Sequence, residues 1–117
     1  MRREELYLQD IVEAAEAIKK FLADIDYSSF QGSDLVRSAV LQKLTMIGEA
    51  AARIPKEFQA RYTDVEWADI IAFRNIAVHA YFAVNWDIVW TTATEDVFVL
   101  EEQIDKILQL EFPKAAQ

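Results

Sequence analysis

The chain has 117 residues, of which 53 % are hydrophobic, with 2 glycines, 2 prolines and no cysteine. This length suits a single compact domain, and the lack of cysteine excludes disulfides, thiol catalysis and thiolate metal sites. The net charge of −8 argues against a broad nucleic-acid-binding face, because such a face places Lys and Arg at the phosphates. Residues 37–74, with six basic and five acidic groups, form the only third of the chain that is not acidic.

The cellular setting is predicted from what the sequence lacks. The N-terminal segment becomes acidic before any apolar core appears, so it is not typical of a signal peptide. Apolar runs stay well short of the roughly 18 residues that a membrane helix needs. Together with the absence of cysteine, these features predict a cytoplasmic protein without a membrane partner.

Helical periodicity begins near the N-terminus. Apolar residues recur at spacings of three and four over residues 4–24, which predicts an amphipathic first helix. Residues 26–32 are interpreted as a linker that carries two aromatic side chains. A second helix is expected over residues 33–54, with Ser33 as its N-cap and Pro55 marking its end. Gly48 inside this helix indicates close approach of a neighbouring helix.

A third helix is expected after a connection or short turn at residues 56–62. Thr63 and Glu66 have the spacing of a capping box, so the helix is predicted to begin at residue 63 or 64 and to end between residues 78 and 82. Its apolar residues cover most of its circumference, which predicts that this helix is largely buried.

The fourth helix is expected over residues 86–110, with Asn85 as its N-cap. The four segments together predict an all-α bundle of four to five helices in up-down order, as a single domain of residues 1–112. Residues 113–117 are expected to be a mobile tail. Large aromatic side chains exceed what one small bundle can hide, which favours a homodimer; they are Trp67, Phe73, Trp86 and Trp90.

Residues 74–82 hold the only histidine of the chain, His79, together with Arg74, Asn75 and Tyr81. Histidine can take and give a proton near neutral pH, and the planar guanidinium of arginine matches phosphate oxygens. Asn75 and His79 are four residues apart, hence on one helix face, so Asn75 could fix the imidazole tautomer. The alternatives are a structural histidine satisfied by a hydrogen bond and a salt bridge from Arg74 to one of the carboxylates.

Other chemistries have weaker support. A second histidine is absent, and the carboxylates lack calcium-ligand spacing, so neither a metal site nor a cofactor is predicted. No glycine-rich phosphate loop appears. Glu49, next to Gly48, is a second candidate residue, either as a surface charge or as a buried partner of Arg74.

The pattern formed by Arg74, Asn75, His79 and Tyr81 resembles the Arg-x4-His-x-Tyr signature of the HEPN superfamily, and specifically of its HepT-like toxins. Three further segments are similar to the same family: IGEAAARIP at residues 47–55, WADIIAFRNIAVHAYF at residues 67–82 and VNWDIVW at residues 84–90. The similarity covers about half of the chain.

This resemblance implies a helical bundle that dimerises and brings two motifs into one cleft. It implies a metal-independent endoribonuclease, the toxin of a type VII toxin–antitoxin module, with Arg74 and His79 as catalytic residues and Asn75 in support. It also implies a partner, a nucleotidyltransferase antitoxin of the MntA kind, that transfers AMP onto Tyr81. RNA cleavage by the 2′-hydroxyl would leave 2′,3′-cyclic phosphate and 5′-hydroxyl ends.

Two other functions stay open at the level of the sequence. The first is a non-catalytic helical partner or regulatory subunit of a nucleotidyltransferase, which the acidic charge favours. The second is a nucleotide-binding regulator in which Arg74 holds a phosphate and His79 never transfers a proton.

Overall fold

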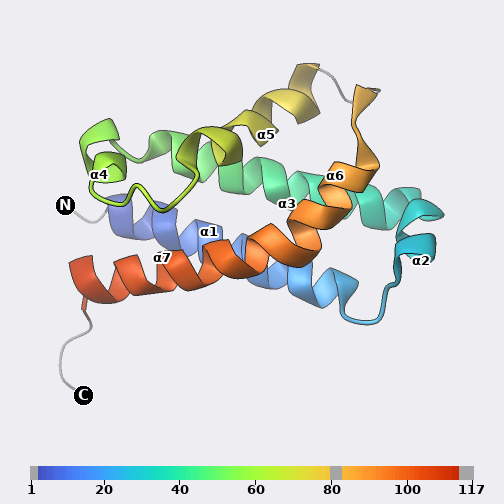
Figure 1. Ribbon diagram of the computed structural model, residues 1–117, viewed down its shortest axis with the longest axis horizontal. Helices are drawn as coiled ribbons and strands as arrows, with labels where there is room; N and C mark the ends of the chain where they lie inside the picture. The colour runs from blue at the N-terminus through green and yellow to red at the C-terminus, as the bar shows by residue number, and fades with distance from the viewer. Residues whose placement is uncertain (1–2, 80–82, 114–117) are drawn as a thin grey trace.

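The computed structural model describes residues 3–79 and 83–113. For residues 76–79 it describes the helical backbone but not the side chains. This part of the chain is helical and contains no β-strand (Figure 1), so the prediction of an all-α fold is confirmed. The elements in chain order are α1 (Arg3–Leu22), α2 (Tyr27–Gln31), α3 (Asp34–Arg53), α4 (Lys56–Ala60), α5 (Trp67–His79), α6 (Trp86–Thr91), the π-helical segment η2 (Thr92–Asp96) and α7 (Val97–Glu111).

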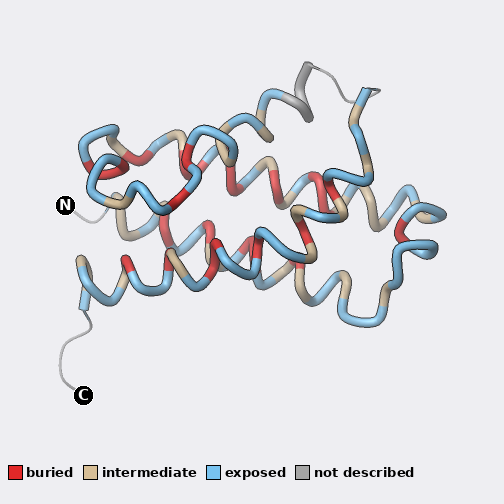
Figure 2. Tube along the Cα trace, viewed as in Figure 1, coloured by how far each residue is buried: buried red, intermediate tan, exposed pale blue. Residues whose placement is uncertain are grey.

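The long helices form a bundle in which α1 packs between α3 and α7, while α3 packs between α1 and α5 (Figure 1). Fully buried side chains of α1, α3 and α7 fill the centre of this bundle, as the red stretches in Figure 2 show. They include Leu8, Ile11, Ile18, Val40, Ile47 and Ile104. Helix α5 lies at the edge of the bundle and makes no other helix contact as extensive as its contact with α3 within the described chain.

The end signals expected for the second and fourth helices are confirmed. The Ser33 hydroxyl accepts a hydrogen bond from the Val36 amide at 3.1 Å, and α3 ends at Arg53, before Pro55. The Asn85 side chain accepts hydrogen bonds from the amides of Asp87 and Ile88 at 3.0 and 3.2 Å. Both caps satisfy backbone donors that the first helical turn leaves without partners.

Residues 26–32 are a short helix rather than the predicted linker. The Asp26 carboxylate accepts a hydrogen bond from the Ser29 amide at 2.8 Å and so caps α2. Phe30 is fully buried, and its ring lies 5.1 Å from the ring of Trp90, between centroids. A helical turn therefore forms here because it buries one aromatic residue in the core, a contact that the local sequence does not disclose.

The prediction that the third helix begins at residue 63 or 64 is wrong, because α5 begins at Trp67. The preceding residues form turns, in which the Val65 amide donates to the Tyr62 carbonyl at 3.2 Å. Val65 is 3 % exposed and fills the core. A non-helical turn forms here because it buries the Val65 side chain, in place of the helical turn that the Thr63 capping box predicts.

The prediction that this helix is largely buried is also wrong for its described side chains. Trp67 is buried, whereas residues 68–75 are all half-buried or exposed, as the pale and tan tube of α5 shows (Figure 2). The helix is apolar around its circumference, but α3 covers only one side of it. Arg74 and Asn75 therefore do not lie in a buried helix, and Asn75 is exposed to solvent.

The last helix follows the predicted path from Trp86 with one irregularity, the π-helical segment η2. The predicted apolar stripe is buried on both sides of this segment, at Val89, Ala93, Val97, Leu100, Ile104 and Ile107. Val89, Ala93 and Val97 are four residues apart, a spacing that drifts about 40° per step in an α-helix. The wider π turn absorbs this drift and keeps the stripe facing the core.

Gly48 lies at a close approach between α3 and α5, as predicted. A Cβ atom at this position would lie 2.9 Å from the Ile70 carbonyl oxygen and 3.1 Å from the Arg74 backbone nitrogen. Both atoms belong to the α5 backbone, which cannot move aside without shifting the helix. A hydrogen atom at residue 48 is therefore what lets the two helices meet backbone to backbone.

We expect Gly48→Ala to destabilise the protein, although alanine favours a helix interior by about 1 kcal/mol. The added methyl group overpacks the α3–α5 contact, an effect of about 1–3 kcal/mol that outweighs the gain in helix propensity. Denaturant unfolding followed by circular dichroism measures the difference.

Gly32→Ala is the matched control, because a Cβ atom there lies at an ordinary 3.5 Å from the nearest atom. Its φ of −84° suits any residue, so this variant should be as stable as the parent, or more stable by up to about 1 kcal/mol. Equal stability of the two variants would contradict the close contact.

Candidate functional site

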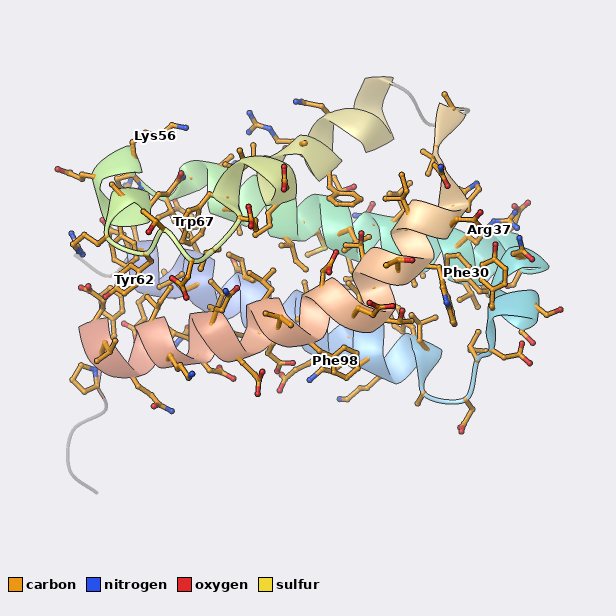
Figure 3. All side chains as sticks on the ribbon, in the orientation of Figure 1. Phe30, Arg37, Lys56, Tyr62, Trp67 and Phe98 are labelled. Carbon is orange, nitrogen blue, oxygen red and sulfur yellow. The ribbon has the colours of Figure 1, made fainter. Side chains whose placement is uncertain are left out.

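The N-terminal end of α5 is fixed by tertiary contacts. The Trp67 indole is buried and donates a hydrogen bond to the Tyr62 carbonyl at 3.0 Å. The side-chain amide of Gln103, on α7, donates a hydrogen bond to the Asp64 carbonyl at 2.9 Å. Tyr62 and Trp67 lie close to each other at the α4 end of the molecule, opposite the end that holds Phe30 and Arg37 (Figure 3). The segment before α5 is therefore tied to α7 as well as to the core.

A second set of contacts joins the residues before α5 to the end of α7. The Tyr62 hydroxyl donates a hydrogen bond to the Glu111 carboxylate, which lowers the pKa of Glu111 and raises that of Tyr62. Arg61 lies 3.1 Å from the same carboxylate and lowers the Glu111 pKa further. Because this pKa is depressed on folding, the contribution of the tie to stability is present near neutral pH and is lost as acid protonates Glu111.

Arg74 lies where α5 meets α3. Its backbone nitrogen and Cβ are the atoms next to Gly48, at 3.1 and 3.4 Å from the position of a Cβ there. Its side chain is half-buried, and among the described side chains it makes no ion pair. The backbone and Cβ of Arg74 are thus fixed by the contact with α3, whereas its guanidinium forms no ion pair with a carboxylate in the described part of the chain.

Asn75 follows Arg74 and is exposed. Helix α5 continues to His79, so residues 75 and 79 share one helix face by register. Arg74 and His79 are five residues apart, about 140° around the axis of a regular helix. The His79 side chain and the whole of Tyr81 lie outside the described residues.

Glu49 is exposed on α3 and makes no ion pair with Arg74 in the described structure. Of the two interpretations made from the sequence, the surface charge agrees with this position. The pair formed by Arg74 and a buried Glu49 does not occur.

A shallow hollow of about 410 Å³ opens at the N-terminal end of α5, beside α4. Its lining includes Lys56, Gln59, Trp67, Ala68 and Ile71. Ile71 precedes Asn75 by four residues, so the hollow extends along the same helix face as Asn75. The exposed Lys56 and Glu66 both line it, so the hollow carries one charge of each sign. The side of α5 that bears Asn75 is therefore exposed at residue 75 and borders a hollow whose lining has no net charge.

The side of α5 away from Asn75 borders a groove lined by four exposed carboxylates. Asp69 lies on α5, Asp64 and Glu66 precede the helix, and Asp96 belongs to η2. Sequence reasoning missed this acidic groove, because the residues come from segments more than twenty positions apart. Among the described residues, no group of three His, Cys, Asp or Glu side chains has the arrangement of a metal site. None of the described helices is long and apolar enough to span a bilayer.

Comparison with known proteins gives one family. The family described as ribonuclease HepT-like matches residues 11–107. A "Probable ribonuclease HepT" of Thermococcus cleftensis is 34 % identical over 101 residues, 86 % of this chain and 92 % of that one. A "Putative RNase" of Methanocaldococcus jannaschii is 33 % identical over 99 residues, 85 % of this chain and 91 % of the relative. A "Putative RNase" of Caldanaerobacter subterraneus is 33 % identical over 105 residues, 90 % and 94 % of the two chains. No solved structure matches this chain.

Arg74→Ala should leave stability nearly unchanged, within about 0.5 kcal/mol. Alanine keeps the Cβ atom that contacts α3, and the described structure assigns no ion pair to the guanidinium. Thermal unfolding of the variant and the parent checks this. A loss larger than about 1 kcal/mol would mean that Arg74 serves the fold through a salt bridge.

Proposed function

Because the chain belongs to the ribonuclease HepT-like family, we propose that it cleaves RNA at a site built on α5. The observation that carries this proposal is the position of Arg74. The backbone of Arg74 lies in the α3–α5 contact, and its side chain has no ion-pair partner in the described structure. It directly precedes the exposed Asn75. Asn75 is exposed on the helix face that by register also bears residue 79.

In the proposed reaction, the ribose 2′-hydroxyl attacks the adjacent phosphorus and the 5′-oxygen leaves. His79 takes the proton of the attacking hydroxyl or gives one to the leaving oxygen, a role worth about 10²–10⁴-fold in rate. The Arg74 guanidinium stabilises the extra negative charge on the phosphate. Asn75 orients the imidazole or the phosphate. The products carry 2′,3′-cyclic phosphate and 5′-hydroxyl ends, and no metal ion takes part.

The active form in this proposal is a homodimer. Helix α5 is apolar around its circumference and is covered by α3 on one side only. Pairing of two copies through the Asn75 face would cover Ile71 and bring two motifs into one cleft, so that one His79 acts as base and the other as acid. It would also combine the two least acidic thirds of the chains, which concentrates positive potential near the phosphate.

The proposed regulation uses Tyr81, two residues after His79. We propose that the protein is the toxin of a type VII toxin–antitoxin module in the cytoplasm, paired with a nucleotidyltransferase antitoxin that transfers AMP onto Tyr81. A bulky anionic group at this position would exclude RNA from the cleft by its size and by charge repulsion.

Cleavage of RNA by the purified protein in EDTA tests the mechanism. We expect Arg74→Ala and His79→Ala each to lower the cleavage rate at least about 100-fold, because each removes one part of transition-state stabilisation. The fragments of the parent reaction should have 5′-hydroxyl ends, which polynucleotide kinase labels directly.

Arg3→Ala is the control, because Arg3 is an exposed arginine at the start of α1, outside the proposed site. It should cleave at the parental rate. Unchanged cleavage by either site variant would rule out the assigned roles. Complete absence of cleavage by the parent, with binding to the nucleotidyltransferase retained, would favour a non-catalytic partner instead.

Co-expression with the nucleotidyltransferase tests the regulation. We expect the peptide that contains Tyr81 to gain mass in steps of one AMP, and the modified protein to lose RNA cleavage. Tyr81→Phe should remove the mass gain because it removes the acceptor hydroxyl, whereas Tyr62→Phe should not. AMP found on another residue in the parent would refute the role of Tyr81.

A further inference from the structure

A groove of about 350 Å³ lies between α5, α3 and the last helix, on the side of α5 away from Asn75. Its apolar floor includes Leu44 and Ile47 of α3, Ile70 and Phe73 of α5, and Leu100 of α7. Leu44, Ile47 and Leu100 are core residues, while Ile70 and Phe73 are half-buried. The groove exists because α5 packs on α3 and does not reach across to α7 (Figure 1).

The rim of the groove is acidic. Four carboxylates line it, from Asp64, Glu66, Asp69 and Asp96, and all four residues are exposed. The lining residues include no lysine, arginine or histidine. An apolar floor with a rim of one charge is complementary to an amphipathic ligand of the opposite charge.

The groove is separate from the proposed RNA site. Phe73 and Asn75 are two residues apart, about 200° around the helix axis, so they lie on opposite faces of α5. RNA phosphates would be repelled by the carboxylate rim. A second copy docked by two-fold symmetry through this groove would set two acidic rims against each other, which excludes the groove as the homodimer contact.

One wall of the groove is formed by the π-helical segment η2, which contributes Thr92 and Asp96. π-helical turns are rare and occur frequently at functional sites. The turn is supported by the Thr94 hydroxyl, which donates to the Trp90 carbonyl at 2.8 Å. It places Asp96 on the rim while Ala93 and Val97 stay in the core.

We infer that this groove docks a basic amphipathic segment of a partner protein. Apolar side chains of the segment contact Ile70 and Phe73, and its Lys or Arg side chains pair with the carboxylates of Asp69 and Asp96. This mode resembles the binding of an amphipathic helix in a hydrophobic groove, with charge pairs that set its orientation. The inference does not depend on RNA cleavage, because the groove shares no residue with the proposed catalytic set.

A synthetic helical peptide serves as the probe, with leucine at positions i, i+3, i+4 and i+7 and lysine at the flanking positions. Isothermal titration calorimetry measures its affinity, and amide NMR shifts map its position. We expect shifts centred on Ile70, Phe73 and Leu100, and a loss of affinity as salt rises. The Asp69→Asn/Asp96→Asn double variant should bind the peptide about tenfold more weakly, as expected for the loss of two exposed charge pairs.

The matched control is the Asp10→Asn/Asp24→Asn double variant, which changes net charge equally at two exposed aspartates outside the groove. It should bind like the parent. Equal weakening by both double variants would show that the peptide follows net charge alone and would overturn the inference. Shifts centred on the Asn75 face would do the same, and so would stronger dimerisation of the Asp69→Asn/Asp96→Asn variant in sedimentation.

Discussion

The contact of α3 with α5 at Gly48 determines where the candidate site lies. Helix α5 has no other extensive contact in the described chain, so its position depends on this approach and on the ties at its N-terminal end. Because Gly48 has no side chain, the Ile70 carbonyl and the backbone amide of Arg74 can pack directly against α3. The direction in which the Arg74 side chain leaves the bundle follows from this backbone contact, which is why a glycine far from the motif in sequence belongs to the site.

The placement of α5 at the edge of the bundle divides its surface in two. One face carries Asn75 and, by register, residue 79, and its N-terminal end borders a hollow lined by Lys56 and Glu66. The other face closes one side of a groove with an acidic rim. The negative charge of that rim would favour cationic segments over phosphates in the groove.

The sequence predicts the features of this fold that depend on neighbouring residues. Ser33, Asn85 and Pro55 mark helix ends as expected, because capping and proline geometry act within a few residues. The start of α5 and the helical turn at Phe30 could not be predicted, because both depend on burial against distant segments. For the site, the shared helix of Arg74, Asn75 and His79 was predictable. The exposure of Asn75 was not, because an all-round apolar helix is typical of a helix enclosed by its own chain.

The π-helical segment has a consequence for how the last helix tolerates changes in length. Residues 86–111 bury one continuous stripe that passes through η2, where the buried residues are spaced four apart. A π turn amounts to one extra residue accommodated within a helix. Removing a residue there would let the helix close its regular ladder and keep Leu100 and Ile104 facing the core, whereas removing one from the α-helical stretch on either side would rotate everything beyond it by about 100°. The number of residues between the two ends of this helix therefore determines whether both ends face the same interior.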